Sequence, residues 1–418
     1  MMEFKRDYYL DQLIRRKHNS LIKVVTGIRR CGKSYLLFTL FVRHLKESGI
    51  DDDHIIALAL DDRKNKQYRD PDALLAYLDS RIVDASPYYI LLDEIQYVPE
   101  FEDVLNSLLH IPNADTYVTG SNSRFLASDI ITEFRGRSSG IHVYPLSFSE
   151  YYAGVGGDRQ EALDTYLRFG GIPLVCNMTD PVEKGEYLKE LFTKIYLADL
   201  KQRHGIRHDA ELEELIEILA SSIGYLTNPK KISDTFRSVK NVSIAPETIT
   251  AYLKYLMDAF LIERGLRYDI RGKKYISTPS KYYFSDIGLR NACLDFHQME
   301  ENYSMENVIC MELKKRGYKV DVGVVTVTEP NKNGVFVRKQ LEVDFVITKG
   351  YNRKYIQSVF SWDSRDAKVQ QEEASLRNID DSFERIIVLR NSGLPYRNEK
   401  GYLILSLSDF LLKPELVD

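Results

Sequence analysis

Short runs of consecutive apolar residues alternate with segments of helical spacing in the N-terminal third of the chain. Residues 21–26, 88–92 and 115–119 are β-rich runs, and the run at 88–92 lacks the alternation of a half-exposed strand. Such a run is typical of a central strand in a parallel sheet that is covered on both faces. Residues 35–42 instead carry apolar side chains at helical spacing. This order predicts an α/β domain with a parallel sheet over residues 1–150.

The pattern becomes helical after residue 150. Apolar residues recur three and four positions apart as far as residue 210, and residues 211–223 and 249–261 continue as amphipathic helices. Residues 261–276 then indicate two short strands joined by a turn, which is the layout of a β-wing. We therefore expect a helical lid and a winged-helix region over residues 151–294.

The last part of the chain mixes both patterns. A helix is predicted at residues 305–316, and Asn333-Gly334 is typical of a hairpin turn. The runs with strand character are residues 318–322, 341–347 and 354–360. We expect a small α/β domain over residues 295–418.

The first predicted strand and helix are joined by a glycine-rich turn with the spacing Gly-x-x-x-x-Gly-Lys-Ser. In this phosphate-binding loop, Gly27 and Gly32 allow the backbone to approach the phosphates closely. Lys33 reaches the terminal phosphates, and the Ser34 hydroxyl is a magnesium ligand. We expect ATP and Mg²⁺ as cofactors, bound by Gly27, Ile28, Arg29, Arg30, Cys31, Gly32, Lys33, Ser34 and Tyr35.

Two adjacent carboxylates, Asp93 and Glu94, follow the buried run at residues 88–92. The carboxyl ends of parallel strands form the edge where ligands bind in open α/β sheets. This is the setting of a Walker B strand, in which Asp93 holds the magnesium shell and Glu94 polarises the attacking water. The alternative is an acidic pair that caps the helix beginning near Pro99, and the upstream phosphate loop makes that alternative the weaker one.

Two further groups of residues are candidates for the same chemistry. Ser121 and Asn122 follow the third strand, where a polar side chain contacts the γ-phosphate and the water, but they equally fit the N-cap of the next helix. Arg135 and Arg137 flank a glycine and are candidates for an arginine finger, which a neighbouring subunit supplies. The alternative for these arginines is surface pairing with acids such as Glu133. A finger from a neighbour would require a homo-oligomer.

These motifs resemble the prokaryotic AAA family ATPases. The resemblance is carried by six stretches spread over nearly the whole chain, which are residues 27–34, 92–96, 135–137, 144–151, 170–173 and 281–290. It implies an AAA+ type P-loop core, a helical and winged-helix middle region, and a C-terminal domain similar to restriction-endonuclease folds. It names no physiological partner.

The strands predicted at residues 341–347 and 354–360 resemble the metal-binding strands of restriction-endonuclease-like nucleases. Such enzymes hold magnesium with carboxylates and place a lysine near the attacked phosphate. The matching positions are Glu306 or Glu312 on the preceding helix, Asp344, and Gln357 at the second acidic or amide position. Val359 stands where the lysine is expected. Because of this departure we favour a structural remnant or a nucleic-acid-binding platform over an active nuclease.

Basic residues outnumber acidic ones in the region from 230 to 281, and tyrosines lie between them. The cations of this region include Lys230, Lys231, Arg237, Lys240, Arg264, Arg267, Arg271, Lys273, Lys274 and Lys281. Such a region contacts a phosphate backbone and stacks on bases or sugars. The alternative is a solvated face, or pairing with acids of the ATPase core. We favour nucleic-acid contact, with DNA as the candidate partner and RNA as the alternative.

The composition of the chain argues against several classes of protein. The net charge of −4 gives no global argument for a nucleic-acid partner, and no apolar stretch approaches the length of a membrane span. The charged N-terminal residues do not resemble a secretory signal, so we expect a cytoplasmic protein. Its four cysteines are far apart, which argues against disulfides and structural zinc. Cys31 is either a low-pKa thiol beside Lys33 or, as we favour, a small residue that the loop tolerates.

The sequence thus predicts an ATP-binding, ATP-hydrolysing molecular switch that acts on DNA or on a protein partner. The main alternative is a nucleic-acid effector in which ATP gates cleavage near Asp344. A small-molecule P-loop kinase is a third and weaker class, because the chain continues into winged-helix and nuclease-like modules rather than an acceptor pocket.

Overall fold

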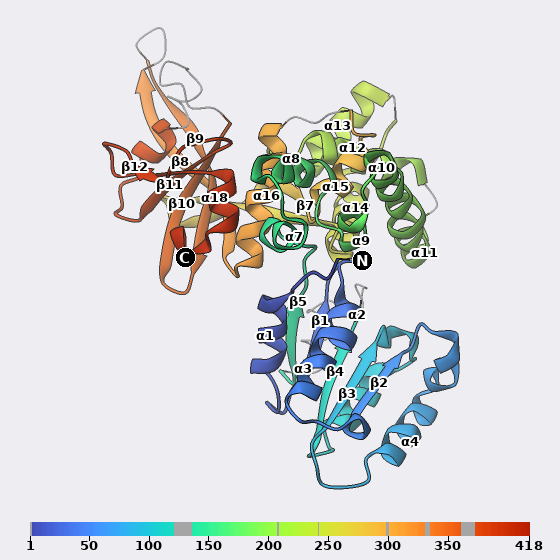
Figure 1. Cartoon of the computed structure of the whole chain (residues 1–418). Helices are drawn as coiled ribbons and strands as arrows, with labels where there is room; N and C mark the ends of the chain where they lie inside the picture. Colours follow the sequence, from blue (N-terminus) through green and yellow to red (C-terminus); the bar gives the residue numbers. More distant parts are fainter. Residues whose placement is uncertain are drawn as a thin grey trace. The chain divides into compact units, whose positions relative to one another are not determined.

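A computed structural model describes residues 2–120, 136–206, 209–240, 242–297, 301–330, 335–360 and 373–418 (Figure 1). The chain forms two compact units. The nucleotide unit consists of Glu3–Pro145 and Asp258–Phe260. The second unit consists of Met1–Met2, Leu146–Met257 and Leu261–Asp418. None of the helices in these described stretches is long and apolar enough to cross a membrane.

The nucleotide unit contains a five-stranded parallel sheet with the order β2-β3-β4-β1-β5. The strands are β1 Ile22–Thr26, β2 Ile55–Ala59, β3 Tyr88–Asp93, β4 Ala114–Thr119 and β5 Ser138–His142. All six residues of β3 are buried, as its continuous apolar run predicts. The order sets β1 beside β4, and β4 beside β3, so the ends of these three strands share one edge of the sheet.

Helices cover both faces of this sheet. On one face, α4 Pro71–Arg81 and α5 Phe101–Leu108 pack leucines, a valine and Phe101 onto alternate residues of β1, β2 and β3. On the other face lie α1 Asp7–Arg15 and a continuous helical stretch formed by α2 Lys33–Tyr35, η1 Leu36–Phe41 and α3 Val42–Glu47. Phe41 of this stretch packs its ring 4.7 Å from that of Tyr117 on β4. The predicted α/β core with a parallel sheet is therefore confirmed.

The second unit begins with helices. They are α7 Phe148–Val155, α8 Arg159–Phe169, α9 Pro173–Asn177, α10 Pro181–Glu190, η6 Leu191–Leu197, α11 Ala198–His204, α12 Asp209–Ser221, α13 Pro229–Lys240 and α14 Pro246–Asp258. The helix α13 was not predicted, although its apolar positions follow one helix face. Helices α15 Ile287–Cys293, α16 Glu301–Lys315 and α18 Leu407–Leu412 lie later in the chain.

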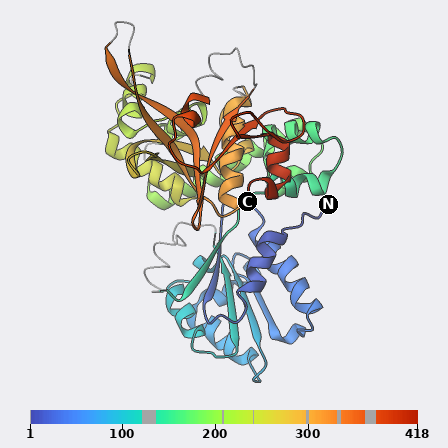
Figure 2. The same ribbon diagram turned by 90° about the vertical axis from the view of Figure 1, so that its left-hand side faces the viewer.

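An eight-stranded mixed sheet completes the second unit, with the order β12-β13-β11-β10-β9-β8-β6-β7. The strands are β6 Ile262–Asp269, β7 Lys274–Phe284, β8 Lys319–Pro330, β9 Phe336–Lys349, β10 Asn352–Val359, β11 Glu384–Leu389, β12 Tyr396–Arg397 and β13 Leu403–Ser406. Strands β8 and β9 form the antiparallel hairpin that Asn333-Gly334 predicts, although that turn lies outside the described residues. Helix α16 packs across the sheet against β7, β8, β9 and β10 (Figure 2).

The predicted β-wing differs from expectation in its partners. Strands β6 and β7 do form an antiparallel hairpin, but β6 also pairs in parallel with β8 through Arg267, Tyr268 and Asp269. The sheet therefore contains strands from both sides of the predicted boundary between residues 294 and 295. Local patterning shows that two strands form a hairpin and cannot show which third strand joins them.

Two glycine-containing motifs of the second unit pack directly against each other. A Cβ on Gly170, whose φ is +72°, would lie 2.2 Å from a carboxylate oxygen of Asp286, and a Cβ on Gly288 would lie 2.0 Å from the Phe169 carbonyl oxygen. Asp286 accepts hydrogen bonds from the backbone N–H of Gly171 at 2.7 Å and of Leu289 at 3.0 Å, so it caps α15. Glycine is therefore required at both positions, because there is no space for a side chain.

Replacing Asp286 by asparagine is expected to change how stability depends on pH. Burial raises the pKa of Asp286 to about 6, against the backbone hydrogen bonds that oppose it. The folded state therefore binds the Asp286 proton more tightly than the unfolded state does. The resulting contribution to the free energy of unfolding is complete below the unfolded pKa of about 4, and it is lost as pH rises through about 6. Urea unfolding from pH 4 to 7 should show the variant gaining about 2–3 kcal/mol relative to the wild type.

The matched control for this prediction is Asp158→Asn, because Asp158 is an exposed N-cap of α8. Both variants exchange a capping carboxylate for an amide that also caps helices. A difference in unfolding free energy between Asp286→Asn and wild type that stays constant with pH would contradict the prediction.

Candidate nucleotide-binding site

The turn between β1 and α2 requires its two glycines. Gly27 has φ +144°, and a Cβ there would lie 2.2 Å from the Val143 carbonyl oxygen. Gly32 has φ +99° at the N-cap of α2. The Cys31 thiol is buried and donates to the Val143 carbonyl at 3.3 Å, which favours packing over an exposed reactive thiol. The loop is thus held tightly against the segment that follows β5.

Lys33 lies within this loop. Its side chain is buried, and its ammonium donates to the carbonyl oxygens of Gly27 and Ile28 at 3.0 Å each. A positive charge is therefore held where the loop backbone and the start of a helix converge, which is an arrangement that attracts anions. The neighbouring Ser34 is exposed at the first turn of the same helix.

Ser34 and Asp93, which the sequence predicts as magnesium ligands, lie close enough together for the Ser34 hydroxyl to lower the pKa of Asp93. Asp93 ends β3 and is buried, and burial raises its pKa while hydrogen bonds from Ser34 and Thr119 oppose that rise. A carboxylate at the end of β3 and a hydroxyl in the first turn of α2 are hard oxygen ligands of the kind that Mg²⁺ prefers.

Glu94 follows β3 with a left-handed backbone, φ 52° and ψ 50°. A non-glycine residue in this region is uncommon and such residues are concentrated at functional sites. Its N–H donates to the Thr119 hydroxyl at 3.0 Å, and its carboxylate accepts from the Gln96 amide. Neither Glu94 nor Glu100 makes a side-chain cap hydrogen bond to the helical turn that it precedes. The structure therefore gives no support to the helix-capping alternative.

Thr119 is a site residue that the sequence reasoning missed. It ends β4 fully buried, its hydroxyl donates to the Asp93 carboxylate, and it accepts from Glu94 N–H. One hydroxyl thus fixes both acidic residues. The available signal was its position as the last residue of the third β-rich run, directly before Gly120.

Of the residues predicted as the sensor and the arginine finger, the structure describes Arg137. Ser121, Asn122 and Arg135 lie outside the described residues. Arg137 has an exposed side chain, and its carbonyl accepts from Ile22 N–H at 3.0 Å at the start of β1. The sensor and arginine-finger roles stay predictions.

A second missed residue, Arg6, ties the N-terminal segment to the phosphate loop. Arg6 is buried, and its guanidinium donates to the carbonyl of Cys31 at 3.4 Å and to that of Tyr144 at 2.5 Å. The guanidinium also lies 4.6 Å from the centre of the Tyr9 ring, and the Tyr9 hydroxyl accepts from Tyr144 N–H at 3.1 Å. Arg6 therefore holds the loop and the end of β5 in a fixed relation.

Replacing Arg6 by alanine is expected to raise the KM for ATP by roughly tenfold with a smaller effect on kcat. The reason is that the loop loses a donor on the Cys31 carbonyl while Lys33 and the acidic residues are unchanged. Steady-state phosphate release over a range of ATP concentrations measures this split. Arg43→Ala is the control, because Arg43 pairs with Glu3 of the same segment at 2.6 Å but is half exposed. Equal losses in the two variants would contradict a role of Arg6 at the loop.

The second unit brings the three predicted C-terminal residues together. Glu306 of α16, Asp344 of β9 and Gln357 of β10 are buried, and Asp344 N–H donates to the Gln357 amide oxygen at 3.2 Å. Lys281 of β7 enters the same cluster, with its ammonium 2.8 Å from Glu306 and 3.7 Å from Asp344. Among the described residues, no group of three or more histidine, cysteine and acidic side chains has an arrangement that could hold a metal ion.

Lys281 and the carboxylates around it change one another's pKa values. Burial alone would lower the pKa of Lys281, but the carboxylates of Glu306, Asp344 and Glu342 raise it well above its usual value. Burial raises the pKa of Glu306 to about 7, against the attraction of Lys281. Lys281 therefore stays an ammonium inside the fold.

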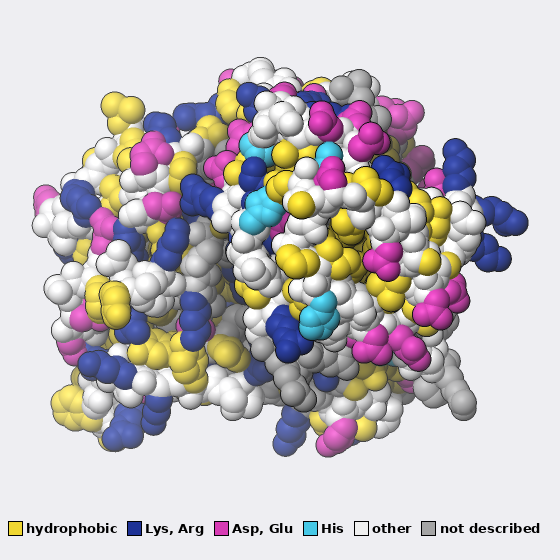
Figure 3. Space-filling view, turned by 90° about the horizontal axis from the view of Figure 1, so that it is seen from below, with side chains coloured by type: hydrophobic (Ala, Val, Ile, Leu, Met, Phe, Trp, Pro, Cys, Tyr) yellow, Lys and Arg dark blue, Asp and Glu magenta, His cyan; other side chains and the backbone are white. Residues whose placement is uncertain are grey.

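The predicted basic region needs correction, because several of its cations serve the fold itself. Lys281 is buried, Arg267 donates to Gln340 at 2.7 Å, and Arg271 donates to the carbonyls of Thr326 and Asn378 at 3.1 and 2.9 Å. Among the described side chains of the predicted set, the exposed cations include Lys230, Lys231, Arg237, Lys273 and Lys274, and the side chain of Lys240 lies outside this description. One face of the molecule shows basic and acidic side chains interspersed (Figure 3).

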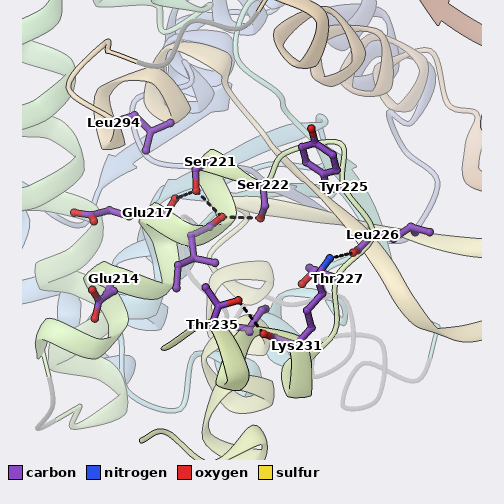
Figure 4. Close-up of a pocket in the computed structure, with 12 residues that line it drawn as sticks. Glu214, Glu217, Ser221, Ser222, Tyr225, Leu226, Thr227, Lys231, Thr235 and Leu294 are labelled. Atoms are coloured by element: carbon purple, nitrogen blue, oxygen red, sulfur yellow. Dashed lines mark hydrogen bonds between the residues drawn. The ribbon is translucent and has the colours of Figure 1, made fainter. Parts of the chain in front are cut away.

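A pocket of about 440 Å³ lies beside α12 and α13 in the second unit (Figure 4). Its walls combine carboxylates and hydroxyls with apolar side chains, from Glu214, Glu217, Ser221, Tyr225, Ile232 and Leu294 among others. Lys231 borders it and donates to the Leu226 carbonyl at 3.3 Å. No pattern in the sequence indicates this pocket.

The strand order and the loop geometry define an AAA-type P-loop protein. Residues 19–152 match the family described as AAA domain, and residues 160–300 match the domain of unknown function DUF8612. A protein of Haemophilus influenzae is 32% identical over 416 residues, which cover 98% of each chain. The present chain belongs to the same family as that protein.

Two further comparisons found similar proteins. A protein of Methanocaldococcus jannaschii is 28% identical over 399 residues, which cover 88% of this chain and 84% of that one. A solved Walker-type ATPase of Pyrococcus abyssi is 17% identical with a TM-score of 0.49, and the match covers 70% of this chain and 96% of the other.

Proposed function

We propose that the protein binds ATP with Mg²⁺ and hydrolyses it as an AAA+ type molecular switch. The observation that carries the proposal is the convergence of Ser34, Asp93 and Thr119 next to the Lys33 loop. In this proposal Lys33 contacts the terminal phosphates, and Ser34 and Asp93 hold the metal shell. Glu94, anchored through its N–H to Thr119, polarises the attacking water.

Further residues complete the proposed reaction. Ser121 or Asn122 senses the γ-phosphate, and Arg135 or Arg137 reaches the nucleotide of a neighbouring subunit in a homo-oligomer. The nucleotide is held by the loop residues Gly27, Ile28, Arg29, Arg30, Cys31, Gly32 and Tyr35. We retain a cytoplasmic location and the domain limits 1–150, 151–294 and 295–418 as proposals.

DNA is the proposed partner of the winged-helix region. Helices α12, α13 and α14 precede the β6–β7 hairpin, and Thr227 between α12 and α13 forms an antiparallel bridge to Ser280 of β7. This order of three helices and a hairpin supports a winged helix. The exposed Lys230, Arg237, Lys273 and Lys274 supply charge for phosphate contacts.

The test compares ATP turnover alone, with double-stranded DNA, with single-stranded DNA and with RNA. Stimulation by DNA that weakens as salt increases is expected. A double variant, Lys273→Ala with Lys274→Ala, should lose that stimulation while its basal turnover is retained. Turnover that no nucleic acid changes would redirect the proposal to a protein partner.

The second candidate is an ATP-gated nuclease of restriction-endonuclease type in the C-terminal domain. The clustering of Glu306, Asp344 and Gln357 favours it, while the buried Val359 at the expected lysine position disfavours it. Incubation of plasmid and RNA with ATP and Mg²⁺ or Mn²⁺ tests this candidate. Cleavage that persists in Asp344→Ala would exclude the assignment to this site.

A further inference from the structure

The carboxylate cluster around Lys281 is held by donors from several elements of the second unit. Glu306 accepts from the Lys281 ammonium and from the Tyr283 hydroxyl, each at 2.8 Å. Asp344 accepts from Ser358 N–H at 2.9 Å and from the Ser358 hydroxyl at 2.8 Å through the same oxygen. One oxygen of each carboxylate, Oε1 of Glu306 and Oδ2 of Asp344, is therefore already hydrogen-bonded within the protein.

The Lys281 ammonium lies where three carboxylates converge. It is 2.8 Å from Glu306, 2.7 Å from Glu342 and 3.7 Å from Asp344, and its side chain is 2% exposed. A divalent cation bound to the same carboxylates would have to lie about 2.0 to 2.6 Å from their oxygens. It would then be a close neighbour of a buried ammonium, and like charges repel strongly in a dry interior.

We propose that Lys281 is an internal counter-ion that closes this cluster to divalent cations. Its ammonium supplies the positive charge that a metal ion would otherwise supply to Glu306, Glu342 and Asp344. The cluster is consequently a latent cation site, and removing the ammonium opens it.

The experiment measures Mn²⁺ binding to the nucleotide-free full chain by electron paramagnetic resonance and by calorimetry. The wild type is expected to show no Mn²⁺ site that depends on Asp344. Lys281→Met is expected to gain one site, with Mn²⁺ affinity at least tenfold above that of the wild type, and Mn²⁺ should raise its melting temperature. Asp344→Asn in the Lys281→Met background should remove the gained site.

Lys314→Met is the matched control, because Lys314 pairs with the single carboxylate of Glu263 at 2.9 Å in the same unit. It should gain no Mn²⁺ site. Since Lys281→Met leaves three carboxylates without their cation, a second variant combines it with Glu342→Gln to reduce the uncompensated charge. Circular dichroism identifies which of the two is folded.

Two results would overturn the proposal. One is a Mn²⁺ site in the wild type that Asp344→Asn abolishes, a measurement that requires no Lys281 variant. The other is a folded Lys281 variant without any gain in Mn²⁺ binding. ATP turnover depends on Lys33 in the other unit, so failure of this proposal and failure of the proposed ATPase are distinguishable.

Discussion

Replacing Lys33 by alanine is expected to reduce ATP turnover by roughly 10²- to 10³-fold, the range observed when one charge-stabilising donor is removed from an active site. The ammonium of Lys33 is held inside the loop by the Gly27 and Ile28 carbonyls, 3.0 Å from each. Its charge is therefore preorganised beside the helix start, where the terminal phosphates are proposed to bind. Alanine removes this charge and leaves the loop backbone in place. Release of inorganic phosphate measures the loss.

The control for this variant is Lys46→Ala. Lys46 belongs to α3, two turns or more beyond the loop, and forms an exposed ion pair with Asp52 at 2.6 Å. Exposed pairs of this kind contribute little to stability, so turnover should remain at the wild-type level. Turnover by Lys33→Ala that equals that of Lys46→Ala would exclude the proposed role of the loop.

The nucleotide loop was predictable because all the residues that define it lie next to one another in the sequence. Two glycines, a lysine and a serine occur at fixed spacing between one β-rich run and one helical run, and the structure places them at that junction. The sequence did not show why Gly27 is required, because its close neighbour is the Val143 carbonyl, more than a hundred residues later. Motif spacing encodes local geometry, whereas this contact depends on the parallel pairing of β1 with β5.

The residues that support the site were not predictable from local pattern. Thr119 reaches Asp93 only because β4 lies beside β3, and Arg6 reaches Cys31 and Tyr144 only after the sheet has formed. A threonine at the end of a β-rich run and an arginine near a chain start are both ordinary surface candidates. Their burial makes them important, and burial follows from tertiary contacts.

The burial of Lys281 was also not predictable from local pattern, and here the sequence suggested a functional surface residue instead. In the sequence it extends a basic region, because cations are usually exposed. In the structure Ser280–Phe284 at the end of β7 is continuously buried, and the ammonium meets carboxylates from α16 and β9. The apolar and aromatic residues that follow Lys281 were a signal for a buried strand. The charge that compensates the lysine comes from residues 25 and more positions away, which no local pattern shows.

Replacing Glu94 by glutamine is expected to slow hydrolysis by roughly 10²- to 10⁴-fold while ATP remains bound. Glutamine keeps the size of the side chain and leaves the backbone N–H bond to Thr119, but it cannot accept a proton from water. Single-turnover assays measure hydrolysis, and the nucleotide retained after gel filtration shows whether ATP is trapped. Glu100→Gln is the control, since Glu100 has a similar left-handed backbone but an exposed side chain.

This pair of variants separates two explanations of the acidic residues. If Glu94 acts on the attacking water, Glu94→Gln retains ATP and Glu100→Gln hydrolyses it normally. If Glu94 only shapes the turn after β3, both substitutions leave turnover near the wild-type level, because glutamine preserves the turn. Loss of both binding and hydrolysis in Glu94→Gln would instead indicate that the carboxylate belongs to the metal shell with Asp93. The Thr119 hydroxyl holds Asp93 through its carboxylate, whereas it holds Glu94 only through its backbone N–H. The geometry therefore favours the outcome in which Glu94→Gln retains ATP and does not hydrolyse it.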